Sequence, residues 1–273
     1  EIGEKYLYAV KKAGEVYQFI NDKKGEDQFI AEVSMDETDL PQTPVELLII
    51  LSALARENIP LQTLAPKFSG RFNKGVDYVG DVRQFEKEFE ADIQILDFAI
   101  RQFNLPENLK LSIHTGSDKF SIYPIIGKII KKYDKGIHVK TAGTTWLAEV
   151  TGMCLGGDDG LEVAKRIYLT AYDQVESLTE AYAAVIDIDQ SRLPSTETVK
   201  NWNAEKFVNA LRHVPGHNEY NPHFRQLMHV SYKIAAQMGT EFTDVLKKYE
   251  NTIASEVTEN IFEGHIKRLF FQK

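Results

Sequence analysis

The first 140 residues alternate between helical and strand-like periodicity, and this alternation constrains the fold more than any other feature of the sequence. Apolar residues spaced three and four apart predict helices, whereas short β-branched apolar runs predict strands. Helices are predicted at residues 6–20, 44–56, 81–103 and 120–133, and strands at residues 28–34, 61–65, 109–114 and 136–141. Short connections join these elements, as is typical of parallel βα units.

Parallel βα units form either an open doubly wound sheet or a closed (β/α)8 barrel. No glycine-rich phosphate loop follows any predicted strand, which argues against a nucleotide-binding open sheet. The predicted fold class is therefore α/β, with barrel-like parallel strands of the TIM-barrel type. Because four strands cannot close such a barrel, we expect either that earlier strands lie in a segment absent from this chain or that partner chains cover the open sheet edge.

The rest of the chain is almost entirely helical by pattern. Helices are predicted at residues 161–188, 204–211, 224–238, 244–249 and 255–270. The predicted organisation is thus a set of βα units over residues 1–143 and a helical region over residues 144–273 that packs on them.

Charge and cysteine content exclude several classes of protein. The chain has 32 basic and 40 acidic residues, for a formal charge of −8, and such an acidic surface repels nucleic-acid phosphates. No apolar run approaches the roughly 18 residues of a membrane span. The single cysteine, Cys154, lies in an apolar stretch and is predicted to be a buried thiol. We expect a soluble cytoplasmic protein without nucleic-acid or membrane partners, and a homo-oligomer is left open.

Polar and ionisable residues follow each predicted strand, at the edge where parallel βα proteins hold their active sites. Alternate strand residues point to opposite faces of a sheet. By this alternation His114 and His138, on neighbouring strands, point away from the helices. The same rule selects Asp36 after the first strand, while Glu37 stays a candidate because the alternation need not hold beyond a strand end.

Two histidines beside carboxylates match the nitrogen and oxygen ligands of a divalent transition metal, and Zn, Mn, Ni and Fe all suit such a site. We predict a metal site of Asp81, His114 and His138. Asp81 is equally well placed to cap the helix that follows it, and in that case Asp77 is the substitute ligand. The alternative for each histidine is a structural role in the core or at the surface.

Basic residues near the strand ends predict an anionic substrate such as a carboxylate, although surface ion pairs are the alternative for each. The candidate substrate-binding residues are Lys67, Arg71, Ser117, Asp118, Lys119 and Lys140. Ser117 or Asp118 could instead start a helix. A later cluster contains His213, His217, His223, Arg225 and His229, of which Arg225 and His229 are best placed on a helix to contribute.

At these same strand ends the sequence resembles the tagaturonate epimerase family, whose members interconvert tagaturonate and fructuronate in hexuronate catabolism. The segments that carry the resemblance are residues 34–46 (SMDETDLPQTPVE), 64–81 (LAPKFSGRFNKGVDYVGD), 111–124 (LSIHTGSDKFSIYP) and 138–150 (HVKTAGTTWLAEV). The resemblance implies a barrel-like fold and a divalent-metal-dependent epimerase acting on a hexuronate. It also implies Glu37 as the acid/base residue and Asp81 and His114 as metal ligands. His138 matches a family motif, but its role as a ligand rests on the strand geometry.

The family is longer at its amino end, in agreement with the expected missing strands. For the reaction we expect retro-aldol cleavage and re-addition, with Glu37 moving the hydroxyl proton. The alternatives are another metal-dependent ketose or uronate isomerase or epimerase on a similar barrel, and a catalytically inactive sugar-acid-binding homologue. A nicotinamide dehydrogenase is disfavoured because no GxGxxG motif follows a strand.

Overall fold

The computed structural model describes residues 2–115 and 117–271. It divides into two compact units. The first contains residues 2–70, 79–114 and 124–140, and the second contains the loops around residues 71–78 and 115–123 together with everything described from residue 141 onward. The sequence predicts a boundary between the two regions after residue 143. In the structure the chain passes from the first unit to the second for the last time between Lys140 and Thr141.

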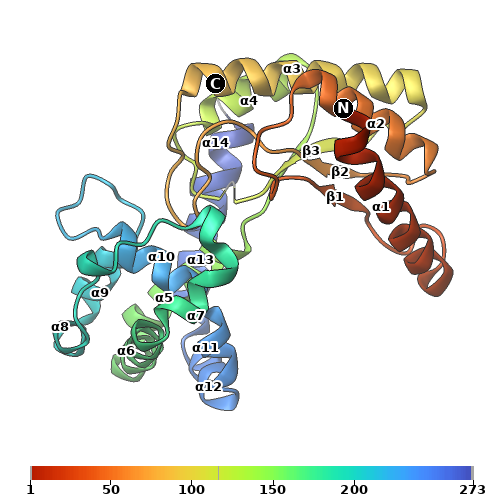
Figure 1. Cartoon of the computed structure of the whole chain (residues 1–273). Helices are drawn as coiled ribbons and strands as arrows, with labels where there is room; N and C mark the ends of the chain where they lie inside the picture. The colour runs from red at the N-terminus through yellow and green to blue at the C-terminus, as the bar shows by residue number, and fades with distance from the viewer. Residues whose placement is uncertain (1, 116, 272–273) are drawn as a thin grey trace. The chain divides into compact units, whose positions relative to one another are not determined.

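The first unit is built on a parallel sheet whose strand order follows the chain, β1-β2-β3-β4 (Figure 1). The strands are β1 (Glu32–Ser34), β2 (Thr63–Ala65), β3 (Lys110–Ile113) and β4 (Ile137–Val139). They alternate with helices α1 (Ile2–Lys24), α2 (Pro44–Arg56), α3 (Val82–Phe103) and α4 (Tyr123–Lys132). The predicted order of elements is therefore confirmed, with strands shorter than their apolar runs.

Local sequence signals fix where the helices begin. Thr43 and Glu46 form a reciprocal capping box at the start of α2, where Pro44 occupies the first turn. Asp81 caps α3, and Asn104 ends that helix in a left-handed conformation with φ 52°. These caps fix where α2 and α3 begin, and so where the connections from β1 and β2 end.

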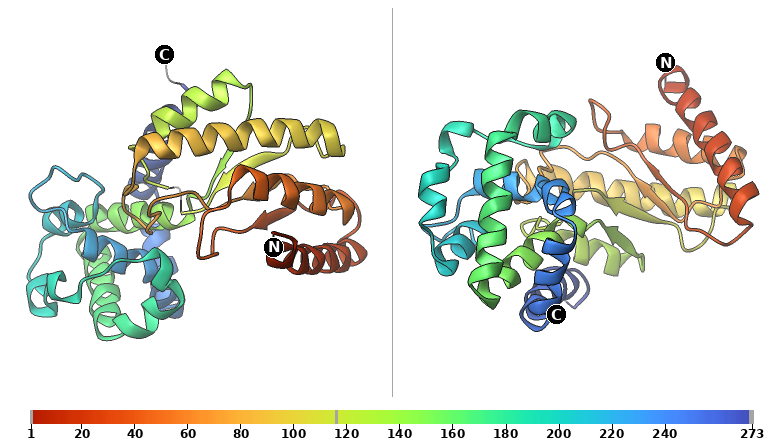
Figure 2. Two further views of the ribbon diagram at one scale, coloured as in Figure 1. Left: turned by 45° about the horizontal axis from the view of Figure 1, so that its top comes forward. Right: turned by 90° about the horizontal axis from the view of Figure 1, so that it is seen from below.

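The two faces of the sheet differ in chemistry. Leu64 and Leu111 are fully buried, and so are Phe85 and Phe89 on α3, the helix that lies across one face of the sheet in Figures 1 and 2. Glu32 and Ser34 on β1 and His138 on β4 are exposed. Apolar burial on one side therefore leaves polar side chains free for chemistry on the other.

The expected α/β class is confirmed, but a closed TIM-type barrel is not. Among the described residues the sheet is open, with β1 and β4 at its two edges. The physical reason is the number of strands, because four parallel strands form an arc rather than a ring.

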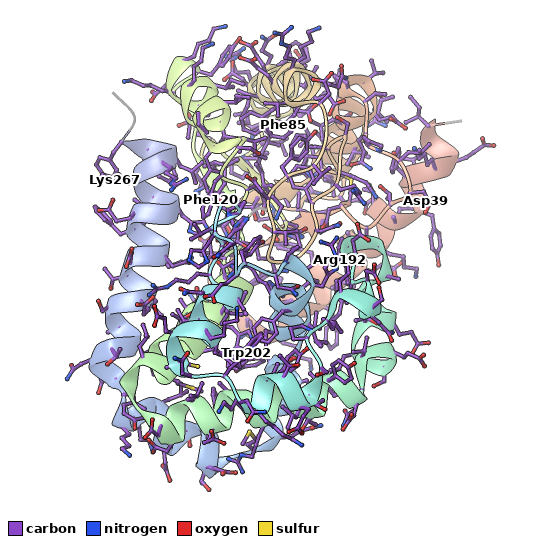
Figure 3. All side chains as sticks on the ribbon, turned by 90° about the vertical axis from the view of Figure 1, so that its left-hand side faces the viewer. Asp39, Phe85, Phe120, Arg192, Trp202 and Lys267 are labelled. Atoms are coloured by element: carbon purple, nitrogen blue, oxygen red, sulfur yellow. The ribbon has the colours of Figure 1, made fainter. Side chains whose placement is uncertain are left out.

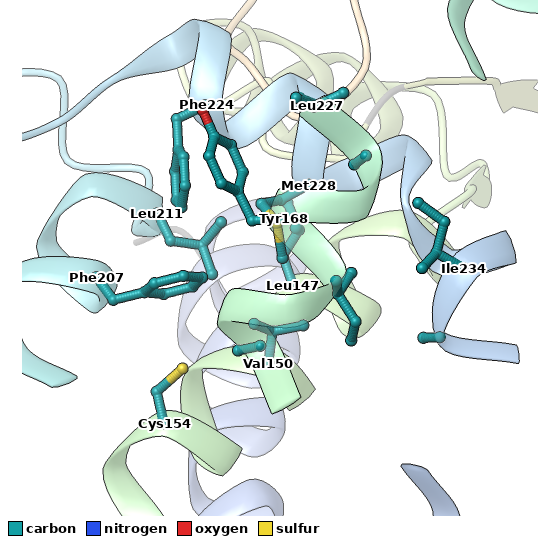
Figure 4. Packing of buried hydrophobic residues seen from close by; sticks show 14 of the residues in the cluster. Leu147, Val150, Cys154, Tyr168, Phe207, Leu211, Phe224, Leu227, Met228 and Ile234 are labelled. Atoms are coloured by element: carbon teal, nitrogen blue, oxygen red, sulfur yellow. The ribbon is translucent and has the colours of Figure 1, made fainter. Parts of the chain in front are cut away.

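The second unit is helical. Its elements are α5 (Ala142–Gly156), α6 (Asp158–Asp173), α7 (Val175–Thr179), η1 (Glu180–Val185), η2 (Gln190–Arg192), α8 (Thr196–Lys200), α9 (Ala204–Leu211), α10 (Pro222–Val230), α11 (Tyr232–Gln237), α12 (Thr240–Lys248), α13 (Glu250–Thr258), the π-helix η3 (Glu259–Ile266) and α14 (Lys267–Phe270). Its core, drawn in Figure 4, includes Tyr168, Phe207 and Phe224, all fully buried. Cys154 is buried there as predicted, and burial raises its pKa.

Three predicted helices are each divided. The predicted helix over residues 161–188 is divided into α6, α7 and the 3₁₀-helix η1, and the one over residues 224–238 breaks at Ser231. The one over residues 255–270 passes through eight residues of π-helix. Apolar periodicity could not locate these breaks, because each neighbouring segment keeps an apolar face toward the same core.

None of the helices described is long and apolar enough to cross a membrane.

Candidate active site

A hydrogen-bonded cluster of histidines and carboxylates lies on the polar face of the sheet in the first unit. Its centre is His114, the residue after β3. The His114 Nε2 atom is 2.6 Å from Oε1 of Glu32, and its Nδ1 atom is 3.1 Å from Oδ1 of Asp36. Glu32 is the first residue of β1 and Asp36 lies in the loop after it, so β1 and its loop supply both carboxylates to an imidazole that follows β3, two strands away in the sheet.

A second layer of side chains orients these groups. The Thr63 hydroxyl donates to Oε2 of Glu32 at 2.7 Å, and the His138 Nδ1 atom lies 3.2 Å from the same oxygen. The Ser112 hydroxyl is 2.8 Å from His138 Nδ1. Strand register explains this convergence, because Glu32 pairs with Thr63, and Ser112 pairs with His138. All four side chains thus lie on the same face of the sheet.

The cluster also holds charge. Burial by itself raises the pKa of the Glu32 and Asp36 carboxyl groups, but hydrogen bonds outweigh it. Thr63, His114 and Ser112 lower the pKa of Glu32 to about 2, and His114 and Ser34 lower that of Asp36. Asp36, and then Glu32, raise the pKa of His114 against the opposing effect of burial. The arrangement therefore favours an imidazolium between two carboxylates.

The cluster is accessible to a small molecule. The His114 side chain is 11% exposed and the His138 side chain 47%. A cavity of ≈ 390 Å³ is lined by Glu32, Thr63, Lys110 and His138 among others. Its volume is that of a small-molecule site, and Ile30 and Ile137 contribute apolar surface beside these polar groups.

Three residues predicted from the sequence, Asp36, His114 and His138, meet in this cluster. Glu37 is exposed and lies one position beyond Asp36. Asp81 caps α3, where its carboxylate accepts hydrogen bonds from the backbone of Arg83 at 2.8 Å and of Gln84 at 3.1 Å.

The predicted substrate-binding residues of the first unit are Lys67 and Lys140. The ammonium group of Lys67 donates a hydrogen bond to the carbonyl of Thr38, in the loop after β1. Lys140 is exposed at the end of β4.

The other four predicted substrate-binding residues lie in the second unit. Arg71 forms an exposed ion pair with Asp187 at 2.8 Å. Ser117, Asp118 and Lys119 are buried. The Lys119 ammonium donates to the carbonyls of Asn73, Val76 and Ser117, and its burial lowers its pKa to about 7. In this structure Lys119 organises two loops.

Part of the later histidine cluster lies on a helix, as expected for Arg225 and His229. His223, Arg225 and His229 lie on α10. Burial, and then the cations Lys74 and Arg225, lower the pKa of His229 to about 3. A side chain at Gly143 would meet the His229 ring, since a Cβ there would lie 1.9 Å from Nε2. His217 is exposed in the loop before α10.

Sequence reasoning did not select Glu32, Thr63 or Ser112 as site residues. Strand alternation already placed Glu32 and Ser112 on the correct face, so the signal was present for these two. Thr63 needed the register of β2 against β1, which no single sequence reveals.

The residues supply suitable metal donors in kind, although they are not arranged around an ion. Imidazole and carboxylate groups gather on one face of the sheet, and both are donors that transition metals accept. Among the described residues, however, no group of three or more His, Cys, Asp or Glu side chains is placed to hold a metal ion. Both ring nitrogens of His114 are bonded to carboxylates, so a metal ligand role for His114 requires one of these bonds to open.

Comparisons with known proteins give consistent results. The sequence profile of the tagaturonate epimerase family matches residues 2–269. A tagaturonate/fructuronate epimerase from Thermotoga maritima is 32% identical over 267 residues, which is 96% of this chain and 48% of that protein. Two crystal structures of fructuronate-tagaturonate epimerase from Cohnella laeviribosi, with one and with two glycerol molecules, are 27% identical with TM-scores of 0.75 and 0.76. Each match covers 97% of this chain and 50% of the solved chain, so the present chain spans about half the length of these relatives.

Proposed function

Because the chain belongs to the tagaturonate epimerase family, we propose that it forms part of the active site of an enzyme that interconverts tagaturonate and fructuronate. The single observation that carries this proposal is the convergence of Glu32, Asp36, His114 and His138 in one hydrogen-bonded cluster on the polar face of the sheet. Groups that shift one another's pKa, as Glu32, Asp36 and His114 do, are typical of catalytic sites.

We propose His114 and His138, with Asp81, as the residues that would hold a divalent cation, which is Zn, Mn, Ni or Fe by donor type. A cation bound there would polarise the substrate's ketone oxygen as a Lewis acid. Glu32 and Asp36 would then orient the two imidazoles through their remaining ring nitrogens. Opening of the 2.6 Å bond between His114 and Glu32 is the change in this chain that would free a ligand nitrogen.

For the reaction we propose cleavage and re-formation of a carbon–carbon bond. The two uronates differ at a hydroxyl-bearing carbon β to the ketone, where loss of the C–H proton gives no stabilised enolate. Instead, the bond from this carbon to the carbon α to the ketone breaks, and its electron pair stays on the ketone fragment as an enediolate. The hydroxyl proton passes to the carboxylate of Glu37 or Asp36, and an aldehyde forms. Re-addition to the other aldehyde face re-forms the bond, and the same carboxylate returns the proton.

For the substrate we propose a hexuronate whose carboxylate is recognised by cationic side chains. Lys140 is exposed at a strand end and is available to such a group. Lys67 would exchange its present partner, the carbonyl of Thr38, for the substrate carboxylate. Arg71, which is paired with Asp187, remains a predicted contact. Ser117, Asp118 and the buried Lys119 remain predicted contacts whose present bonds organise the loops after β2 and β3.

The four parallel strands are proposed to belong to a larger barrel. Further βα units, in the same polypeptide or in a partner chain, would pair with β1 and β4 and correspond to the half of the relatives that this chain does not match. A cytoplasmic location and a homo-oligomeric state are predictions of the same kind.

The proposal is tested by incubating the purified protein with tagaturonate in deuterium oxide and following the products by NMR and mass spectrometry. We expect fructuronate with hydrogen retained at the inverted carbon. Deuterium at that carbon would exclude the retro-aldol route while leaving the epimerase assignment intact. Hexuronate binding without turnover would favour the inactive sugar-acid-binding homologue, and faster turnover of other ketoses would favour a different epimerase or isomerase.

A further inference from the structure

The cavity beside the His114 cluster contains a lysine that has no role in the proposed reaction. Lys110 is the first residue of β3, and it lines the ≈ 390 Å³ cavity together with Glu32, Thr63 and His138. These residues all belong to the first unit. A cation in a small-molecule cavity next to a candidate catalytic cluster is a candidate for substrate recognition.

Strand register places Lys110 on the polar face of the sheet. Glu32 pairs with Thr63, and Thr63 pairs with Lys110, so these three residues form one row across β1, β2 and β3. The next residue of β3, Leu111, points to the opposite face and is fully buried. That face is covered by α3, whose buried Phe85 is labelled in Figure 3. Lys110 therefore shares its side of the sheet with the cluster.

The stem of Lys110 crosses toward the strand that carries His138. A Cβ atom added to Gly136 would lie 3.5 Å from Cδ and 3.9 Å from Cε of Lys110. Gly136 directly precedes β4, and His138 lies two residues after it. The absence of a side chain at Gly136 thus leaves room for the lysine stem beside the start of β4.

The ammonium group of Lys110 is uncompensated. Within the part of the chain that the structure describes, it has no ion-pair or hydrogen-bond partner. Glu32 is the one acidic residue among the described lining, and its carboxylate is already bonded to Thr63 and His114. A cation without a partner in a cavity of this size favours an anionic ligand.

Lys67 and Lys140, the other lysines of this unit that are proposed to contact the substrate, are placed differently. The ammonium group of Lys67 is bonded to the carbonyl of Thr38. The described residues that line the cavity include neither Lys67 nor Lys140. Of these three lysines, Lys110 alone therefore combines a position in the cavity with an ammonium group that is available to a ligand.

The spacing along the strands suits a six-carbon acid. The row that contains Lys110 and the row in which Ser112 pairs with His138 are two residues apart, about 6.6 Å along parallel strands. In a hexuronate of this kind the carboxylate carbon and the ketone carbon are four bonds apart, about 5 Å in an extended chain. A substrate whose carboxylate lies at Lys110 can therefore reach His138 with its ketone end.

We propose that Lys110 determines substrate specificity, because its ammonium group binds the carboxylate of the hexuronate in this cavity. This inference rests on the proposed function and adds to it the residue that distinguishes a uronate from the neutral ketose of the same carbon skeleton. Lys110 binds and orients the substrate and takes no part in proton transfer.

The test compares tagaturonate with tagatose, which has a hydroxymethyl group in place of the carboxylate. Steady-state kinetics give KM and kcat, and isothermal titration gives Kd whether or not the chain turns over either sugar. Methionine keeps an unbranched stem, so Lys110→Met removes the charge alone. We expect KM or Kd for tagaturonate to rise about tenfold to hundredfold, the loss typical of a charged hydrogen bond, with kcat nearly unchanged. The constants for tagatose should not change.

Lys110→Arg keeps the charge and should restore most of the affinity for tagaturonate. The control is Lys87→Met, the same change at an exposed position of α3, which should leave every constant as in the wild type. Circular dichroism establishes that each variant is folded.

Equal losses for both sugars in Lys110→Met would indicate a structural role and overturn the proposal. Loss of tagaturonate affinity in Lys140→Met or Lys67→Met, but not in Lys110→Met, also overturns it while the proposed function stands. A wild type that neither binds nor converts tagaturonate overturns the proposed function as well.

Discussion

His114 is the residue on which the candidate active site depends, because both of its ring nitrogens are committed to carboxylates. Glu32 and Asp36 hold it from two sides, and Thr63 and Ser34 in turn fix those carboxylates. A histidine restrained in this way keeps one ring orientation and therefore one direction for proton transfer or metal ligation.

Two substitutions separate the proposed roles at the residue scale. Glu37→Gln should lower turnover of tagaturonate at least about a hundredfold, the usual contribution of a general acid–base group, while metal content stays constant. His114→Ala should lower both turnover and metal content. Steady-state kinetics and elemental analysis measure the two effects.

The controls are Glu26→Gln and His217→Ala, which make the same changes at exposed positions. Turnover within twofold of wild type in Glu37→Gln would remove this residue from the mechanism. Full metal content in His114→Ala would remove the ligand role.

The pH dependence of stability should report the charged cluster. The pKa of His114 is raised above 6.5 in the folded chain, so its contribution is complete below pH 6.5 and disappears as pH rises through the folded value. The pKa of Glu32 is lowered from 4.5 to about 2, so its contribution is complete above pH 4.5 and disappears on acidification toward pH 2. Between these limits both contributions are present.

Buried His229 acts in the opposite direction, because its lowered pKa favours the folded chain as pH rises. The measurement is therefore the difference in free energy of unfolding between wild type and His114→Gln across pH 4–9. We expect the largest difference between about pH 4.5 and 6.5 and a decline above that range. A difference that grows above pH 7 contradicts the bridging imidazolium.

At the residue scale, the sequence predicted which side chains lie in the cluster better than it predicted their hydrogen-bond partners. Strand alternation was sufficient to place Asp36, His114 and His138 on one face. The bonds that give them charge depend on Glu32 and Thr63, whose pairing across β1 and β2 is a tertiary property.

At the scale of elements, the start of α3 is the decisive feature, because Asp81 has two candidate roles there. Its carboxylate accepts two backbone hydrogen bonds from the first turn of the helix. An N-cap needs only a side-chain oxygen, whereas a metal ligand at this position needs the carboxylate charge.

Asp81→Asn and Asp81→Ala distinguish these roles. Asparagine caps as well as aspartate, so Asp81→Asn should leave the free energy of unfolding unchanged, and Asp81→Ala should reduce it by about 1 kcal/mol. If Asp81 also binds metal, as we propose, both variants should lose metal in elemental analysis. Retention of metal by Asp81→Asn, with stability lost only in Asp81→Ala, would assign Asp81 to capping alone.

Elements that carry caps were predicted to within a residue or two, as α2 and α3 show. The ends of elements without capping signals were not predicted as closely. The divisions between α6 and α7 and around the π-helix η3 have no distinguishing residue pattern, because helical propensity is similar on both sides.

For the whole molecule, the notable feature is that the second unit draws on three stretches of sequence. Residues 71–78 and 115–123 belong to it together with the chain from Thr141 onward. Asp118 from one of these loops is the buried partner of Arg225 on α10, and Gly75 from the other accepts a hydrogen bond from the same guanidinium.

A fragment of residues 141–273 should therefore fail to fold. It leaves Arg225 buried without its carboxylate, a loss of about 3–5 kcal/mol that is comparable with the stability of a small domain. Thermal unfolding followed by circular dichroism should show a cooperative transition for the full chain and none for the fragment. A cooperative transition in the fragment would show that the loops are dispensable.

The overall architecture was predictable in class but not in closure. Alternating periodicities identified the α/β class and the parallel strands from local pattern alone. Whether the sheet closes into a barrel depends on strands beyond the four that pair in the described structure. No local sequence pattern contains that information.

The confinement of the His114 cluster to residues 32–138 has a consequence for how genes of this kind can diversify. Recombination at any point outside that interval keeps all residues of the cluster together in one coding segment. Lineages could therefore exchange or refashion the flanking coding sequence while inheriting the reactive rim as one block.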